Sequence, residues 1–217
     1  MINYYNSEFE QNHNLEPSDP LPITIPKGLT VLSGLPKVGK SLLALQITLA
    51  TIEGKSVCGL SFGHGPVSHF ALQDNKRRVY DRLGKSGYEN LLTPYLFSIY
   101  TSGSLPPLDE NGTDKLRDLL REFPALALVV IDGFELVCEK NSTRALRKLN
   151  RFADENNIRV LAVTHFRKPS VETNILLSRP FLSQIATLAI PSHGFREKIV
   201  LDKKTLKWEL YSGGGPQ

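Results

Sequence analysis

Apolar and polar positions alternate along this chain in blocks whose period changes. Short apolar runs, several of them rich in β-branched residues, predict strands at 29–33, 67–72, 95–100, 126–131 and 159–163. Longer apolar or amphipathic segments predict helices at 42–52, 74–86, 114–121 and 142–156. This alternation is typical of an α/β fold, in which a mostly parallel central sheet is flanked by helices.

The pattern changes after residue 185. Strand-like segments at 186–190, 197–201 and 206–211 follow one another with no helical pattern between them. The simplest interpretation is a C-terminal antiparallel strand extension of the sheet.

The two ends of the chain differ from the part between them. Residues 1–21 are polar and mildly acidic, and we expect a flexible N-terminal arm there. Residues 213–217 carry glycines and predict a flexible tail. Residues 22–212 are then one domain, which suits a chain of 217 residues.

Composition excludes several classes of protein. No apolar run reaches the ~18 residues of a membrane span, and no secretory signal is visible at the start. Cys58 and Cys138 lie far apart, which favours free thiols in a cytoplasmic protein. The histidines show no spacing typical of a metal site. The net charge of +4 is compatible with nucleic acid but does not require it.

The strongest chemical signal is the run from Gly34 to Ser41, which fits the phosphate-binding pattern G-x-x-x-x-G-K-[ST]. Its glycines let the backbone wrap around phosphate, and the start of the following helix adds positive potential. Lys40 is expected to reach the β- and γ-phosphates, and the Ser41 hydroxyl to bind Mg²⁺. The residues expected to contact the nucleotide are Gly34, Pro36, Lys37, Val38, Gly39, Lys40, Ser41 and Leu42.

A second metal-side group is expected at the end of a buried strand. Asp132 follows the apolar run 126–131 and is the natural candidate, although an aspartate there can also be a turn residue or a helix cap. The only Asn-Lys pair, Asn75-Lys76, lacks the aspartate of the N-K-x-D element of GTPases. This favours ATP as the nucleotide, without deciding the matter.

These motifs together resemble the RecA-like P-loop ATPases, and more narrowly the AAA-type group that includes the plasmid replicative helicase RepA. The matching segments are 25–34, Pro36-Lys37, Gly39-Lys40-Ser41, 71–74, Val130-Ile131-Asp132 and 164–168. The resemblance covers about residues 22–212, and the last third matches only in pattern. It implies a RecA-like core that binds ATP and Mg²⁺ at subunit interfaces, works as a homo-oligomeric ring or filament, and contacts single-stranded DNA.

The resemblance also implies roles for single residues. His165 stands where the family has a polar residue that senses the γ-phosphate; the alternative is a strand-end histidine bonded to a backbone carbonyl. Gln73 stands where the family usually has the glutamate that polarises the attacking water. Glutamine can orient a water but cannot accept its proton as a carboxylate does, so we expect weak or partner-dependent hydrolysis. Asp74 is an alternative base, unless it points to the opposite face or caps the next helix.

Basic residues supply further candidates. The resemblance implies a basic finger that reaches a neighbouring subunit's nucleotide from near a C-terminal strand, which favours Arg196 or Lys198 over Arg179. Four bases share one face of the predicted helix 142–156 and are candidate DNA contacts: Arg144, Arg147, Lys148 and Arg151. The resemblance, in which the segment after His165 can be a DNA-contacting loop, adds Arg167, Lys168 and Arg179. The bases of 76–85 form a second group. For each of these residues, a solvated surface charge is the alternative.

Three functions remain open on the sequence. The first is an ATPase that acts on or near DNA in replication or recombination. The second is an ATP-binding regulatory or assembly switch, working with a protein partner and with little turnover. The third, a small-molecule phosphotransferase, is disfavoured because no arginine-rich lid is evident.

Overall fold

The computed structural model describes residues 23–34, 36–37, 39–57, 59–85, 96–138, 142–165, 186–189, 198–202 and 207–211. Its centre is a sheet of six strands, all parallel, in the order β5–β4–β6–β7–β2–β8. These strands are β2 (Gly28–Gly34), β4 (Val67–Ala71), β5 (Phe97–Thr101), β6 (Leu128–Asp132), β7 (Arg159–His165) and β8 (Ala186–Ala189). The predicted α/β fold is therefore confirmed.

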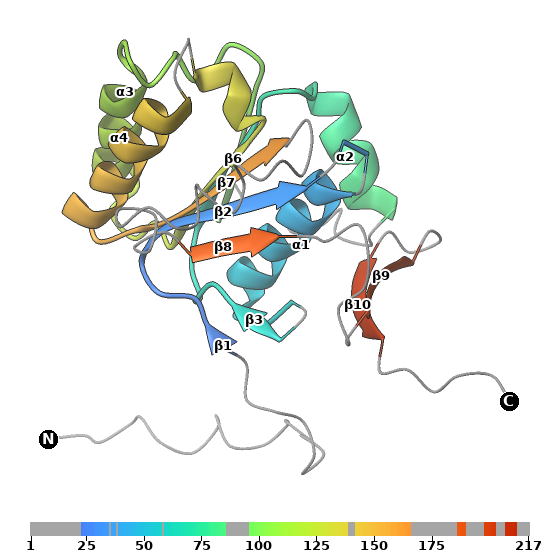
Figure 1. Cartoon of the computed structure of the whole chain (residues 1–217). Helices are drawn as coiled ribbons and strands as arrows, with labels where there is room; N and C mark the ends of the chain where they lie inside the picture. The colour runs from blue at the N-terminus through green and yellow to red at the C-terminus, as the bar shows by residue number, and fades with distance from the viewer. Residues whose placement is uncertain are drawn as a thin grey trace, which may run out of the picture.

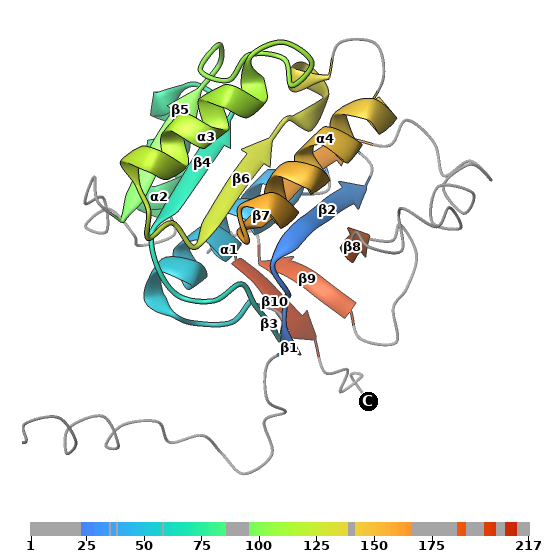
Figure 2. The same ribbon diagram turned by 90° about the vertical axis from the view of Figure 1, so that its left-hand side faces the viewer.

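In the part of the chain that the structure describes, four helices cover the two faces of this sheet (Figures 1 and 2). They are α1 (Lys40–Glu53), α2 (Lys76–Lys85), α3 (Gly112–Glu122) and α4 (Ser142–Glu155). Helices α1 and α2 pack on one face, and α3 and α4 on the other. A 3₁₀ turn, η2 (Phe134–Val137), follows β6 directly.

The alternation of side chains along β6 shows how one apolar run serves both faces. Leu128 and Val130 belong to the core beneath α1, whereas Val129 and Ile131 belong to the core beneath α3 and α4. All four are fully buried. A strand covered on both faces has no polar side, which is why this segment reads as an unbroken apolar run.

The helices differ in how much of their surface is buried. Helix α1 is buried around most of its circumference and turns its apolar residues toward β4, β6 and β7. Thr48 and Thr51 lie within it, and each hydroxyl donates to the backbone carbonyl four residues earlier. Helices α3 and α4 are amphipathic, with one buried face and one charged face.

The C-terminal strands differ in part from the prediction. β9 (Lys198–Asp202) and β10 (Lys207–Tyr211) are antiparallel as expected, but they form a two-stranded sheet of their own. The prediction that the segment at 186–190 is antiparallel was wrong, because β8 lies parallel to β2. The 20 residues 166–185 between β7 and β8 exceed the dozen or so that a parallel crossover requires. A second small sheet pairs β1 (Ile23–Thr24) with β3 (Leu60–Ser61).

The predicted N-terminal arm at 1–21 and the tail at 213–217 lie outside the described residues, so the domain limits of 22–212 stay a prediction. Over the part of the chain that is described, no helix combines the length and the apolar character needed to cross a membrane.

Candidate nucleotide-binding site

The phosphate loop connects β2 to α1 at the carboxyl edge of the sheet. Gly34 ends β2, Pro36 and Lys37 are exposed, and Gly39 precedes the first turn of α1. Gly39 has φ +92°, a left-handed backbone conformation that residues other than glycine adopt only with strain. Leu42 is half-buried in the first turn, while Val38 lies outside the described residues. The sequence pattern has thus produced the strand, turn and helix start that phosphate binding requires.

Lys40 is buried at the beginning of α1, with 3% of its surface exposed. Burial lowers the pKa of its ammonium group, and the carboxylates of Glu135 and Asp132 oppose that effect. A shielded ammonium group beside the amino end of a helix is suited to a polyanionic ligand.

Ser41 and Asp132 meet across the helix–sheet boundary. The Ser41 hydroxyl donates to Asp132 Oδ1 at 3.1 Å, joining the first turn of α1 to the end of β6. Burial raises the pKa of the Asp132 carboxyl to about 6, and the hydrogen bond from Ser41 acts in the opposite direction. A hydroxyl and a carboxylate are oxygen donors of the kind that Mg²⁺ prefers, so these two residues fit the predicted metal role.

Within the described ranges, no group of three or more His, Cys, Asp or Glu side chains could hold a metal ion. Mg²⁺ bound together with a nucleotide usually takes one or two ligands from the protein and the others from phosphate oxygens and water.

Gln73, Glu135 and His165 form a polar cluster beside this centre. Gln73 follows β4, Glu135 lies in η2 after β6, and His165 ends β7. Gln73 Nε2 donates to Glu135 Oε1. His165 Nε2 lies 3.4 Å from the same carboxylate oxygen and 3.5 Å from Gln73 Oε1. The two predicted residues are thus brought together, and the alternative reading of His165 as a histidine bonded to a backbone carbonyl is not the one observed.

The sequence reasoning missed Glu135. Its only signal was an acidic residue three positions after Asp132, in the run Asp-Gly-Phe-Glu. Gly133 lets the chain turn at this point with φ +95°, and a Cβ there would lie 2.9 Å from Cγ of Gln73. The close approach of Gln73 to η2 therefore depends on a glycine at this position.

Asp74 is paired with two arginines of α2. Its carboxylate, 8% exposed, pairs with Arg82 and with Arg78 at 3.5 Å. It does not cap α2 either, because Asn75 Oδ1 accepts the backbone N–H of Arg78 at 3.0 Å. Asn75 therefore fills the role of helix cap that was suggested for Asp74. The ion pairs of Asp74 oppose its other suggested role, that of catalytic base.

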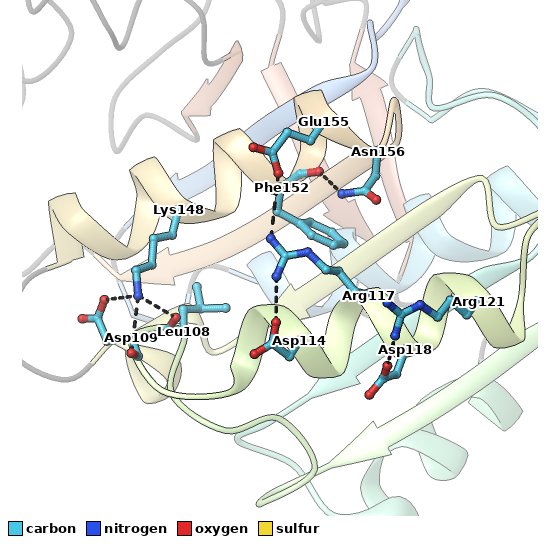
Figure 3. Close-up of polar contacts among 10 residues, drawn as sticks. All are labelled: Leu108, Asp109, Asp114, Arg117, Asp118, Arg121, Lys148, Phe152, Glu155 and Asn156. Atoms are coloured by element: carbon cyan, nitrogen blue, oxygen red, sulfur yellow. Dashed lines mark hydrogen bonds and ion pairs between the residues drawn. The ribbon is translucent and has the colours of Figure 1, made fainter.

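The basic face of α4 is partly tied to the rest of the protein (Figure 3). Lys148 Nζ lies 3.1 Å from Asp109 Oδ1 and donates to the carbonyl oxygens of Leu108 and Asp109. Arg144 also pairs with Asp109, at 3.4 Å. Arg147 and Arg151 are exposed on the same helix. Two of the four predicted DNA contacts on this helix therefore already neutralise a carboxylate.

Most of the basic candidates after His165 cannot be placed. Arg167, Lys168, Arg179 and Arg196 lie outside the described residues. Lys198 begins β9.

The buried Lys40, the Ser41–Asp132 pair and the loop between β2 and α1 together define a P-loop nucleotide-binding domain. A family model described as an AAA domain (AAA_25) matches residues 11–171, so the chain belongs to this family of AAA-type P-loop ATPases. The comparison with curated proteins returned no match.

Proposed function

We propose that this chain binds ATP with Mg²⁺ and hydrolyses it weakly or in dependence on a partner, acting on or near DNA in the manner of the RepA-type helicases it resembles. The observation that carries the proposal is the Ser41–Asp132 hydrogen bond beside the buried Lys40. It joins the phosphate loop to the strand end from which a metal-side carboxylate is expected.

Each residue then has a definite task. Lys40 contacts the β- and γ-phosphates, and Ser41 and Asp132 hold the metal ion. Mg²⁺ supplies neutralisation of the charge on the phosphate oxygens. Gln73 orients the attacking water, and His165, in contact with Gln73, reports the state of the γ-phosphate.

The assembly and the DNA contacts are part of the same proposal. We expect a homo-oligomeric ring or filament, in which Arg196 or Lys198 of one subunit reaches the nucleotide of the next. The bases on α4 remain the candidates for single-stranded DNA, namely Arg144, Arg147, Lys148 and Arg151; Arg144 and Lys148 also pair with Asp109.

The experiment that tests nucleotide binding compares wild type with Lys40→Ala by titration with ATP and Mg²⁺. Loss of the buried ammonium should weaken binding by about 100-fold or more, in keeping with its several charge-assisted contacts to phosphate. Unchanged affinity in Lys40→Ala would remove the basis of the proposal. Steady-state hydrolysis with and without single-stranded DNA then tests the DNA role, for which acceleration is expected.

A second candidate is an ATP-binding regulatory or assembly switch with little or no turnover. Gln73 favours it, because glutamine accepts no proton from water. Tight ATP binding, no hydrolysis with or without DNA, and an oligomeric state that depends on ATP would support this candidate over the first.

A further inference from the structure

The attack of water on the γ-phosphate releases a proton, and the described site has three carboxylates that could receive it. Asp132 accepts a hydrogen bond from Ser41 and belongs to the metal side. Asp74 is paired with two arginines. Glu135 is the third, and it neither faces the metal side nor pairs with an arginine among the described residues.

The surroundings of Glu135 suit a group that acts on water. Its Oε1 is held by Gln73 Nε2 and lies 3.4 Å from His165 Nε2. Its Oε2 is shielded from solvent and has no hydrogen-bond partner among the described residues. One oxygen is therefore fixed by the protein while the other keeps its capacity to accept a hydrogen bond.

Glu135 also lies at the same edge of the sheet as the phosphate loop. It stands in η2, three residues after Asp132, and its partners Gln73 and His165 stand at the ends of β4 and β7. Because the strands of the central sheet are parallel and β2 leads into the phosphate loop at this carboxyl edge, Glu135 lies beside the candidate nucleotide site.

We propose that Glu135 is the general base of this site, and that Gln73 is a positioning residue that holds its carboxylate together with His165. The inference rests on the proposed ATP hydrolysis. In the step, a bond forms between the water oxygen and the γ-phosphorus while the bond from that phosphorus to the bridging oxygen breaks. ADP leaves with the electron pair of the broken bond, and the proton of the water passes to Glu135 Oε2.

This arrangement reverses the expected effect of restoring an acidic residue at position 73. If the base belonged at position 73, Gln73→Glu would raise turnover. If Glu135 is the base, Gln73→Glu removes the amide donor and sets a second negative charge against Glu135 Oε1, so that turnover falls.

The experiment measures kcat and KM for ATP hydrolysis and the affinity for ATP, with Mg²⁺, in wild type, Glu135→Gln, Gln73→Glu and Gln73→Ala. Glu135→Gln should lower kcat by about 100-fold or more, the usual range for loss of a general base, with ATP affinity within about threefold of wild type. Gln73→Ala and Gln73→Glu should also lower kcat, by about 10-fold, and leave KM unchanged. Glu122→Gln is the matched control, since Glu122 is exposed at the end of α3 before β6 begins, at the opposite edge of the sheet.

Three results would overturn the inference. Turnover of Glu135→Gln within threefold of wild type, with a gain in Gln73→Glu, would return the base to position 73. If wild type binds ATP but never hydrolyses it, the proposed nucleotide binding stands and Glu135 is not a general base. If wild type does not bind ATP at all, the proposed function itself is refuted. The binding measurement therefore tells failure of the inference from failure of the proposed function.

Discussion

His69 is a buried titratable group whose protonation should destabilise the fold. It lies in β4 with 2% of its surface exposed, and its Nδ1 is 2.8 Å from the hydroxyl oxygen of Thr48 in α1. That hydroxyl donates its single hydrogen to the carbonyl oxygen of Ala44 at 2.9 Å. It must therefore accept from His69, so the ring carries a hydrogen on Nδ1.

The size of the effect follows from the change in the pKa of His69 on folding. Burial, aided by the charge of Arg82 and opposed by that of Asp74, lowers the pKa from 6.5 to about 4. The difference, 6.5 − 4, corresponds to about 3 kcal/mol at ~1.4 kcal/mol per pH unit. The unfolded chain binds the proton first, so this stability is complete above pH 6.5 and is lost as the pH falls toward 4. Small domains have a total free energy of unfolding of about 5–15 kcal/mol, so the loss is substantial.

Asp132 acts in the opposite direction over part of this range. Its pKa is raised on folding from 3.8 to about 6, so the folded protein binds that proton first and gains stability as the pH falls between those values. The wild-type profile is therefore a sum of opposing contributions. A comparison of two chains that differ only at His69 removes the contribution of Asp132.

The assay is urea unfolding from pH 4 to pH 8 without Mg²⁺ or nucleotide, for wild type and His69→Asn. Asparagine keeps an N–H donor near the place of Nδ1 but does not titrate, so its packing loss is the same at every pH. The free energy of unfolding of wild type, measured relative to that of His69→Asn, should fall by about 3 kcal/mol from pH 7.5 to pH 4. The exposed His64 provides the matched control His64→Asn. Parallel curves for wild type and His69→Asn would refute the reasoning.

Two further substitutions test the site from other directions. Gly133→Ala should destabilise the fold by about 1–2 kcal/mol because its φ is positive, and should lower hydrolysis about 10-fold because the new Cβ meets Gln73. Gly103→Ala shares the positive φ but has open space around it, so an equal loss of hydrolysis there would contradict this account. Asp74→Asn should cost about 2 kcal/mol in urea unfolding, because Arg82 loses its charged partner. Turnover of Asp74→Asn should stay within threefold of wild type; a collapse of kcat with unchanged stability would make Asp74 the base after all.

The sequence was most informative where function depends on residues close together in the chain. The phosphate loop lies within eight residues, and its glycines and lysine require one local geometry. Asp132 could be predicted because a fully buried parallel strand has a recognisable apolar run, and its carboxyl end lies at the same edge of the sheet as the phosphate loop that follows β2. The main helices and strands follow from the same periodicities.

What the sequence did not reveal depends on contacts between distant segments. Glu135 lies on a 3₁₀ turn and meets Gln73, which is 62 residues earlier in the chain. No periodic pattern in the sequence predicts such a contact, because the orientation of the turn is set by the positive φ of Gly133. The ion pairs of Asp74 were not visible in the sequence for a similar reason, since Arg78 and Arg82 come within reach only after α2 has formed. The direction of β8 likewise depends on pairing with β2, which its own residues do not specify.

The deep burial of α1 has a consequence for the thermodynamics of binding. A helix packed on most sides can neither rotate nor slide without opening cavities in a close-packed interior. Lys40 and Ser41 lie in its first turn, so their backbone is fixed by the same core that fixes the helix. Association normally costs free energy because the binding groups must become ordered. Here the backbone of Lys40 and Ser41 is already fixed when the chain folds. A phosphate ligand therefore meets a preorganised pair rather than two groups that must still be immobilised.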